Sequence, residues 1–283
     1  MTNNCLKDMT ERVSRGHIYI QNKNIGFFKA RSIIDTGFVE HGFTGRTGGV
    51  SEGPYDSLNF SLSRPDNMQN VKKNYELMAY AANFEPESIA IVSYEHGDGV
   101  CRVSEKDRGS APNTSKSLPP CDGIITNDPL VTLVTLHADC GALFFVDPKN
   151  RAVGLAHAGW RGTLLRIAAK VVSAMQNEFG SQPEDIIAAA GPCICGECYE
   201  VDEELAAKFI NEFKTENIIR RKCGKSYLDM SLCVLIQLAQ AGVNAKNITL
   251  FDACTYEMKE SFFSYRRDKG QTGAMAAFMR IKS

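Results

Sequence analysis

Residues 135–162 read TLHADCGALFFVDPKNRAVGLAHAGWRG. Two short apolar runs, 142–146 and 152–156, flank the turn-forming letters DPKN, and this pattern predicts a β-hairpin. Cys140 comes just before the first run, and His157 follows the second. Antiparallel pairing across the turn would therefore bring a thiol and an imidazole to the same end of a sheet.

Another apolar run ends on a histidine, at Glu95-His96. His96, Cys140 and His157 are side chains that zinc prefers, and three protein ligands leave a fourth position open for water or substrate. Zinc would lower the pKa of a bound water to about 7. Asp139 and Glu95 each adjoin a ligand, so either could orient an imidazole or move protons.

Spacing alone leaves other interpretations of the same residues open. His41 and His137 are also within reach as ligands. Without a metal, Cys140 could act as a nucleophilic thiolate with His157 as its base. In a purely structural interpretation, the thiol packs as a small hydrophobic group and the histidines form local hydrogen bonds. The metal content of the protein would distinguish a metal site from the interpretations that need no metal.

The ten cysteines are scattered along the chain, which is not the framework of a small disulfide-rich domain. In a reducing compartment most are expected to be free, buried thiols. Cys195 and Cys198 form a C-x-x-C pair, but no second C-x-x-C or H-x-x-x-H pair exists in the sequence. The spacing therefore does not favour a zinc knuckle.

A glycine-rich segment, residues 44–55, matches neither a phosphate-binding loop nor a dinucleotide fingerprint. It is either a surface turn or a ligand loop. In the second case Arg46 would offer its planar guanidinium to a phosphate or a carboxylate.

Composition excludes several classes of protein. The 32 Lys and Arg residues balance 33 Asp and Glu residues, which argues against nucleic-acid binding through bulk charge. No run of 18 apolar residues is present, so no membrane span is expected. The polar amino terminus has no apolar signal region, and we expect a cytoplasmic protein.

Strand and helix patterns are intermixed, which predicts a single α+β domain over residues 16–283 with helices outside mixed β-sheets. Residues 1–15 are expected to be loosely ordered, and residues 107–120 to form a mobile loop. Helical spacing predicts helices over 67–83, 164–179, 201–213 and 232–239. Short apolar runs predict strands at 17–20, 25–28, 38–43, 89–94, 186–190, 248–251 and 275–281.

Several short motifs occur together and in a fixed order. The most specific are Ala138-Asp139-Cys140 and the string AHAGWRG at 156–162. Others are HGF at 41–43, RTGGVS at 46–51, SLN at 57–59, EHG at 95–97, DGIIT at 122–126, CYEV at 198–201 and FSYRR at 263–267. Together they resemble the YfiH family, also called the laccase-domain or polyphenol oxidase family, over about residues 35–281.

This resemblance implies an α-β-β-α layered sandwich. It also implies a metal site, usually zinc with copper as the alternative, formed by His96, Cys140 and His157. Two further positions, Arg46 and Asn59, would line the pocket, and Arg161 would meet an anion.

Members of the family resemble purine nucleoside enzymes that phosphorolyse adenosine, inosine and methylthioadenosine and that deaminate adenosine. The implied partners are a small nucleoside and phosphate, and a monomer is the default expectation. The implied catalytic residues are Cys140, His157, Asp139 and Arg46.

The chain departs from the family pattern in two places: Tyr94-Glu95 replaces Gln-Val, and Gly273-Ala274 replaces Gly-Arg. Arg266, Arg267 and Arg280 are candidate substitutes for the missing arginine. The H-x-E motif of zinc deaminases is also absent.

Three alternative functions remain at this level. One is a peptidoglycan-editing hydrolase that acts on a muropeptide precursor, with Cys140 as nucleophile. Another is a metal-dependent polyphenol oxidase, but a laccase site needs paired H-x-H ligands, and this chain has five histidines and no such pair. The third is a metal-containing binding protein without catalytic activity.

Overall fold

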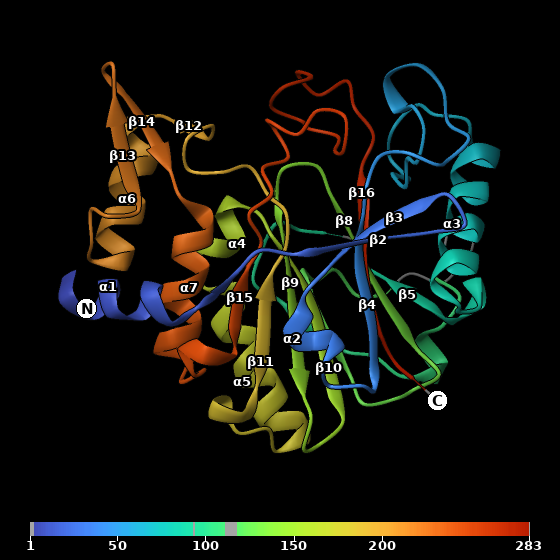
Figure 1. Ribbon diagram of the computed structural model, residues 1–283, viewed down its shortest axis with the longest axis horizontal. Coiled ribbons are helices and arrows are strands. Elements are labelled where there is room, and N and C mark those ends of the chain that lie inside the picture. The colour runs from blue at the N-terminus through green and yellow to red at the C-terminus, as the bar shows by residue number, and fades with distance from the viewer. Residues whose placement is uncertain (1–2, 93, 111–117, 283) are drawn as a thin grey trace.

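Two large β-sheets pack face to face and are enclosed by helices, as the computed structural model in Figure 1 shows. The structure describes residues 3–92, 94–110 and 118–282. The single mixed domain confirms the predicted fold class. The expected mobile loop falls largely on residues 111–117, which lie outside the described residues.

The first sheet has seven strands and carries the predicted hairpin. Its order is β1 (Ser14–Arg15), β15 (Ile248–Leu250), β11 (Ile187–Ala190), β9 (Gly141–Asp147), β10 (Ala152–Ala158), β7 (Gly123–Thr126) and β6 (Val100–Arg102). The β9–β10 pair is antiparallel and pairs Ala152 with Asp147 and Ala158 with Gly141. This register confirms the hairpin.

The second sheet has six strands and is antiparallel except at one edge. Its order is β2 (Ile18–Asn22), β3 (Ile25–Lys29), β4 (Val39–Thr44), β16 (Met275–Ile281), β8 (Thr132–His137) and β5 (Ile89–Ile91). Only β5 and β8 run parallel in this sheet. A small third sheet, β12 (Glu200–Val201), β14 (Lys225–Leu228) and β13 (Ile219–Lys222), lies apart from the two large ones.

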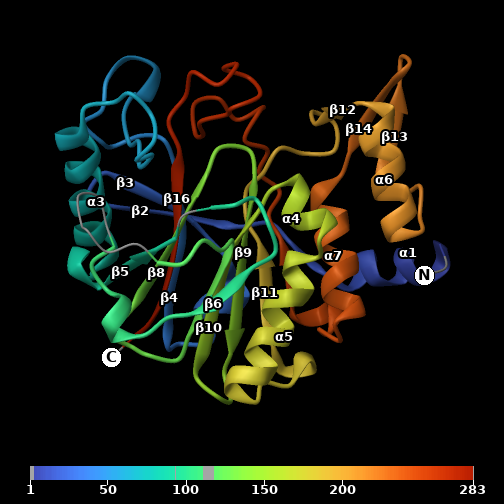
Figure 2. The ribbon, with the colours of Figure 1, turned by 180° about the vertical axis from the view of Figure 1, so that it is seen from behind.

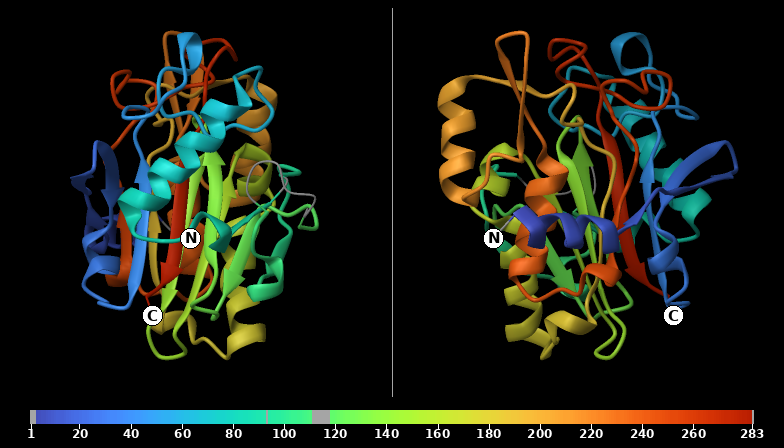
Figure 3. Two further views of the ribbon diagram at one scale, coloured as in Figure 1. Left: turned by 90° about the vertical axis from the view of Figure 1, so that its right-hand side faces the viewer. Right: turned by 60° about the vertical axis from the view of Figure 1, so that its left-hand side comes forward.

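Helices cover both outer faces, as Figure 2 shows from behind. One helix, α3 (Met68–Ala82), lies across the six-stranded sheet (Figure 3, left). The seven-stranded side carries α1 (Asn3–Arg12), α4 (Trp160–Leu164), α5 (Ile167–Phe179), α6 (Glu203–Phe213) and α7 (Met230–Gln240), and the short α2 (Arg31–Ile34) precedes β4. No helix among the described residues is long and apolar enough to cross a membrane.

Alternating side chains explain the layers. On β9, Phe144 faces the core between the two sheets, whereas Phe145 faces the core beneath α5 and α7. On β16, Met279 belongs to the inter-sheet core and Phe278 packs on the side of α3. Both faces of the central strands are thus buried, which is why their sequences read as continuous apolar runs.

The amino terminus corrects a prediction. Residues 3–12 form helix α1, although residues 1–15 were expected to be loosely ordered. Met9 and Val13 are buried in the core of the seven-stranded side, and β1 pairs with β15 in parallel. Few apolar residues signal this attachment in the sequence, and the strand that receives it lies far along the chain.

The helix after the hairpin differs from its prediction. It begins at Trp160 rather than after Thr163, and it breaks at Arg166, whose φ of 68° is left-handed. The second part, α5, ends as predicted at Gly180. Side-chain periodicity alone does not show such a backbone break.

Candidate functional site

The hairpin register places the first two candidate ligands. His157 pairs with Ala142 and Ala158 with Gly141, so Cys140 lies just beyond the strand end and next to Gly159. A Cβ atom built on Gly159 would lie 3.3 Å from the Cys140 sulfur, 3.4 Å from His157 Cε1 and 3.5 Å from His96 Cδ2. The structure therefore brings together the three predicted ligands around one point.

His96 comes from a loop rather than from a strand. Its backbone is left-handed, with φ of 55°. A close backbone contact fixes this loop against α4, because a Cβ atom at Gly162 would lie only 2.6 Å from the carbonyl oxygen of Gly97. Glycine at position 162 allows the approach.

Asp122 organises the cluster from behind. One carboxylate oxygen, Oδ1, lies 2.9 Å from His157 Nδ1. The other, Oδ2, accepts the N–H of Gly97 at 2.7 Å and that of Glu95 at 3.3 Å. Because Nδ1 of His157 is occupied in this way, its Nε2 is the nitrogen left to bind a metal. No pattern in the sequence predicts this role for Asp122.

The neighbours of His157 favour its cationic form. Burial lowers the pKa of His157, but the interactions with Cys140 and Asp122 outweigh burial and raise the pKa to about 9. Burial and the neighbouring His157 lower the pKa of His96. A divalent cation would replace the proton as the positive charge in this cluster.

The other two histidines within reach by sequence form hydrogen bonds elsewhere. His137 Nδ1 lies 3.1 Å from the carbonyl oxygen of Cys140, and its Nε2 lies 2.8 Å from Thr135 Oγ1. His41 is buried, and its Nε2 accepts the N–H of Ala30 at 2.9 Å. These contacts leave His96 and His157 as the imidazoles that face Cys140.

Asp139 faces away from the imidazoles. Its carboxylate accepts the hydroxyl of Thr255 at 2.7 Å, the hydroxyl of Ser264 at 3.0 Å and the N–H of Arg266 at 2.7 Å. These donors hold the segment after β15 against the backbone next to Cys140. The contacts are those of a positioning residue.

A cavity of about 950 Å³ opens over the cluster. Its wall includes His96, Cys140 and His157. Aromatic side chains also line it, namely Tyr94, Trp160, Tyr199 and Tyr265. A volume of this size fits a small organic molecule, and the aromatic rings offer flat apolar surfaces.

Three arginines line the same cavity. Arg161 and Arg266 are exposed, and Arg64 is half-buried. The guanidinium of Arg266 donates to the carbonyl oxygen of Glu200 at 2.7 Å and stacks on Tyr199. Of the arginines proposed as substitutes for the missing family residue, Arg266 is the one placed in this cavity.

Arg46 and Asn59 are placed differently from the expectation that both line this pocket. Arg46 lines a second cavity of about 460 Å³, and its guanidinium donates twice to the carbonyl oxygen of Asp56, at 2.8 and 3.0 Å. Asn59 is buried, and its side-chain oxygen accepts the N–H groups of Ser61 and Ala274. Ser61 and Ala274 themselves line the large cavity, so Asn59 shapes its wall.

The chain is similar to a known protein family and to named relatives. The family described as multi-copper polyphenol oxidoreductase laccase matches residues 40–282. The purine nucleoside phosphorylase YlmD of Bacillus subtilis is 36% identical over 244 residues, covering 85% of this chain and 88% of YlmD. A purine nucleoside phosphorylase of Deinococcus radiodurans is 39% identical over 243 residues, covering 86% and 89%.

A solved structure has the same fold. The crystal structure of YlmD from Geobacillus stearothermophilus superposes with a TM-score of 0.88 at 33% identity, covering 94% of this chain and all of that one. The comparisons confirm the resemblance found in the motifs. They also support an enzyme, since these relatives are named as purine nucleoside phosphorylases.

Proposed function

Because the chain belongs to the multi-copper polyphenol oxidoreductase laccase family, we propose that it is a zinc-dependent purine nucleoside phosphorylase. The observation that carries the proposal is a single cavity that joins the His96, Cys140 and His157 cluster to aromatic walls and to arginines. Adenosine, inosine and methylthioadenosine are the proposed substrates.

His96, Cys140 and His157 would hold the metal, with Asp122 fixing the orientation of His157 through Nδ1. Two imidazoles and a thiolate suit zinc, and all three side chains lie within 3.5 Å of the position of a Cβ atom at Gly159. When bound, zinc supplies a Lewis acid and lowers the pKa of a bound water to about 7.

The walls of the cavity would bind the substrates. A purine ring would pack against the aromatic side chains. The exposed guanidinium of Arg161 would bind phosphate through paired charge-assisted hydrogen bonds, in the role expected for it from the sequence. In the reaction, a phosphate oxygen bonds to C1′ of the ribose, the bond from C1′ to the base nitrogen breaks, and the departing base takes up a proton.

We propose adenosine deamination as a second reaction of the same site. In this reaction water bonds to C6 of the purine, the bond from C6 to the amino nitrogen breaks, and ammonia leaves after a nearby group has moved a proton to it. Glu95 and Asp139 were expected in this role, but three donors already engage the Asp139 carboxylate. Glu95 is exposed next to His96 and is the freer of the two.

Turnover by reduced protein of known metal content tests the proposal. Adenosine, inosine and methylthioadenosine are supplied with and without phosphate, and the products are separated by chromatography. We expect free base and ribose 1-phosphate (5-methylthioribose 1-phosphate from methylthioadenosine) only when phosphate is present, and inosine from adenosine without it. No product from folded, zinc-loaded protein would overturn the proposal, and muropeptide precursors would be tested next.

Cysteine variants connect activity to the site. Cys140→Ser should remove both the zinc bound at this cluster and turnover, because the thiolate is one of three ligands. Cys223→Ser is the matched control, since Cys223 is an exposed thiol in the hairpin of β13 and β14. Full activity in Cys140→Ser would contradict the assignment.

A further inference from the structure

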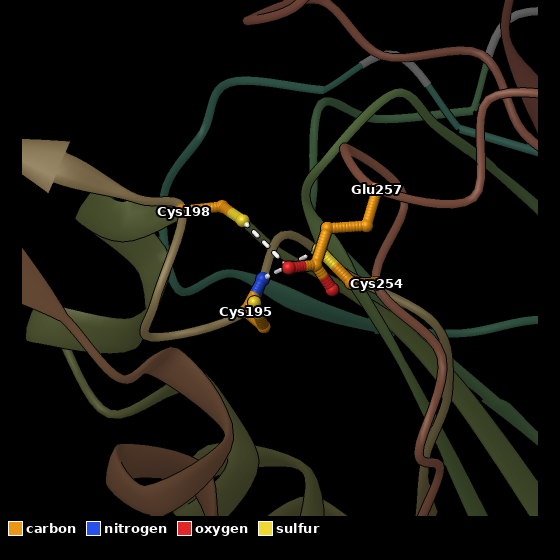
Figure 4. A group of neighbouring side chains, drawn as sticks. All are labelled: Cys195, Cys198, Cys254 and Glu257. Atoms are coloured by element: carbon orange, nitrogen blue, oxygen red, sulfur yellow. Dashed lines mark hydrogen bonds between the residues drawn. The ribbon is translucent and has the colours of Figure 1, made fainter.

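Four metal-binding side chains meet away from the cavity. Cys195 and Cys198 lie on the segment between β11 and β12, and Cys254 and Glu257 follow β15. Their two sulfur-bearing segments run side by side, because Cys193 and Cys254 form a parallel bridge. The three sulfurs and a carboxylate oxygen of Glu257 all lie within 4.8 Å of one another (Figure 4).

The backbone of the C-x-x-C segment is already folded as a tight turn. The N–H groups of Cys198 and Tyr199 both donate to the carbonyl oxygen of Cys195, each at 3.0 Å. The N–H of Cys195 in turn points to the sulfur of Cys254 at 3.4 Å. Such a turn aims two thiols at one point, and an N–H directed at a sulfur stabilises a thiolate.

The spacing fits a tetrahedral ion with a small contraction. At a metal–sulfur distance of about 2.3 Å, tetrahedral geometry sets sulfurs about 3.8 Å apart, so the atoms would move inward by about 1 Å at most. The Cys198 thiol now donates to Glu257 Oε1 at 3.5 Å, a weak contact that an ion would replace. Thiolates with one carboxylate select zinc over calcium or magnesium.

We propose that Cys195, Cys198, Cys254 and Glu257 form a second, structural zinc site. Binding would release the thiol protons to solvent and close a tetrahedron with no open position. The sequence did not predict this site because its second ligand pair is a single cysteine and a glutamate, with Cys254 59 residues after Cys195.

The second site would fix part of the cavity wall. Ile194 and Tyr199 flank the C-x-x-C pair and line the large cavity. On the other segment, Thr255 follows Cys254 and donates to Asp139, which precedes Cys140. An ion held by both segments would therefore tie the part of the wall formed by Ile194 and Tyr199 to the segment that contacts Asp139.

Zinc content of matched variants tests the proposal independently of turnover. We expect two zinc ions per chain in the reduced wild type and in Cys223→Ser, one in Cys140→Ser, one in Cys254→Ser, and none in the Cys140→Ser/Cys254→Ser double variant. Equal zinc in Cys254→Ser and the wild type would overturn the proposal. A failure of the His96, Cys140 and His157 site would instead show as unchanged zinc in Cys140→Ser.

Cobalt separates loss of a ligand from loss of folding. Cobalt bound to Cys140→Ser protein should show a near-ultraviolet band from thiolate-to-metal charge transfer, and the Cys140→Ser/Glu257→Gln double variant should keep the band while binding the metal more weakly. No band in folded Cys140→Ser protein would overturn the proposal. Alkylation followed by mass spectrometry of the wild type should find all three thiols reduced, and a disulfide between any two of them would also overturn it.

Discussion

Asp122 contacts the candidate ligand His157 directly and holds the loop of His96 through the backbone N–H groups of Glu95 and Gly97. Its Oδ1 lies 2.9 Å from His157 Nδ1, and its Oδ2 holds the loop of His96 through the N–H of Gly97 at 2.7 Å. An outer carboxylate of this kind fixes the ring and raises the basicity of the ligand. One buried side chain thus helps to position two of the three candidate ligands.

Replacement of Asp122 by asparagine should weaken zinc binding at this cluster. We expect the zinc affinity of Asp122→Asn to fall by about 10- to 100-fold, because the amide carries no charge and can orient the imidazole less strongly. Competition with a zinc-binding dye measures the affinity. Asp139→Asn is the comparison, since Asp139 contacts Thr255 and Ser264 instead of an imidazole. Equal losses in both variants would contradict this role for Asp122.

The two arginines that the sequence offered for phosphate should behave differently. Arg161→Gln should raise the KM for phosphate by about 10- to 100-fold, because the charge behind its paired hydrogen bonds to phosphate is lost. Arg46→Gln should leave that KM nearly unchanged, because Arg46 binds the carbonyl of Asp56 in the other cavity. Initial rates at varied phosphate measure both. A larger rise in the KM for phosphate in Arg46→Gln than in Arg161→Gln would indicate that Arg46 binds phosphate.

The sequence pattern indicates more clearly which candidate ligands meet than which residues support them. Cys140 and His157 were predictable because a hairpin of known turn fixes which residues meet at its open end. The position of Asp122 was not predictable in this way, because β7 joins β10 from 35 residues earlier in the chain. The sequence did not show that Arg46 lines the other cavity, because a glycine-rich segment has no hydrophobic periodicity from which to infer the direction of a side chain.

At the scale of elements, the β9–β10 hairpin depends on its turn. Asp147 is buried at the end of β9, and its carboxylate accepts the N–H of Lys149 at 2.9 Å and the side-chain N–H of Asn150 at 2.7 Å. Burial raises the pKa of Asp147, but the Ser181 hydroxyl and the hydrogen bonds from Asn150 and Lys149 outweigh burial and hold the pKa below its usual value. The ionised carboxylate therefore stabilises the turn.

Asp147→Asn should reduce the free energy of unfolding at pH 7 by about 1–3 kcal/mol, since a buried hydrogen-bond acceptor with charge is lost. Because the folded pKa lies below the unfolded value, this stabilisation is present above about pH 4 and is lost as the pH falls through the folded pKa. Urea unfolding, measured at several pH values from 7 to 3, should show that the difference in free energy of unfolding between Asp147→Asn and the wild type becomes smaller as the pH falls. The control is Asp35→Asn at an exposed position, and a gap independent of pH would contradict the assignment.

Element type was more predictable than element boundaries. The strand over 275–281 was predicted with the bounds that β16 has, because its apolar run is continuous. The helix after Gly162 was predicted as one piece, yet it breaks at Arg166 in a left-handed conformation. A break in the backbone leaves the order of apolar and polar residues almost unchanged, so the hydrophobic periodicity does not indicate it.

The whole molecule is held together by chain segments distant in sequence. The amino-terminal residues close one edge of the seven-stranded sheet, where Gly16 donates its N–H to the carbonyl oxygen of Leu250 at 3.0 Å. Met9 packs into the core on that side. The layered arrangement itself followed from the family resemblance, whereas this attachment had no signal in the sequence.

Met9→Ala should lower the free energy of unfolding by about 2 kcal/mol, at the lower end for a buried methionine because the site lies near the surface. The melting temperature should fall by about 4–8 °C, given about 2–4 °C per kcal/mol for a chain of this size. Thermal unfolding followed by circular dichroism measures the change. The exposed neighbour Glu11→Ala is the control. Identical melting of both variants would restore the expectation of a loosely ordered amino terminus.

The parallel pairing of β11 with β15 also bears on the order of events during folding. Ala190 and Leu250 are paired neighbours, yet the whole third sheet and helices α6 and α7 lie between them in the chain. Closing so long a loop is entropically unfavourable and therefore comes late. Cys254 reaches Cys195 only after this closure. A newly made chain would thus acquire its second zinc at the end of folding, and the ion would mark the molecules in which the sheet is complete.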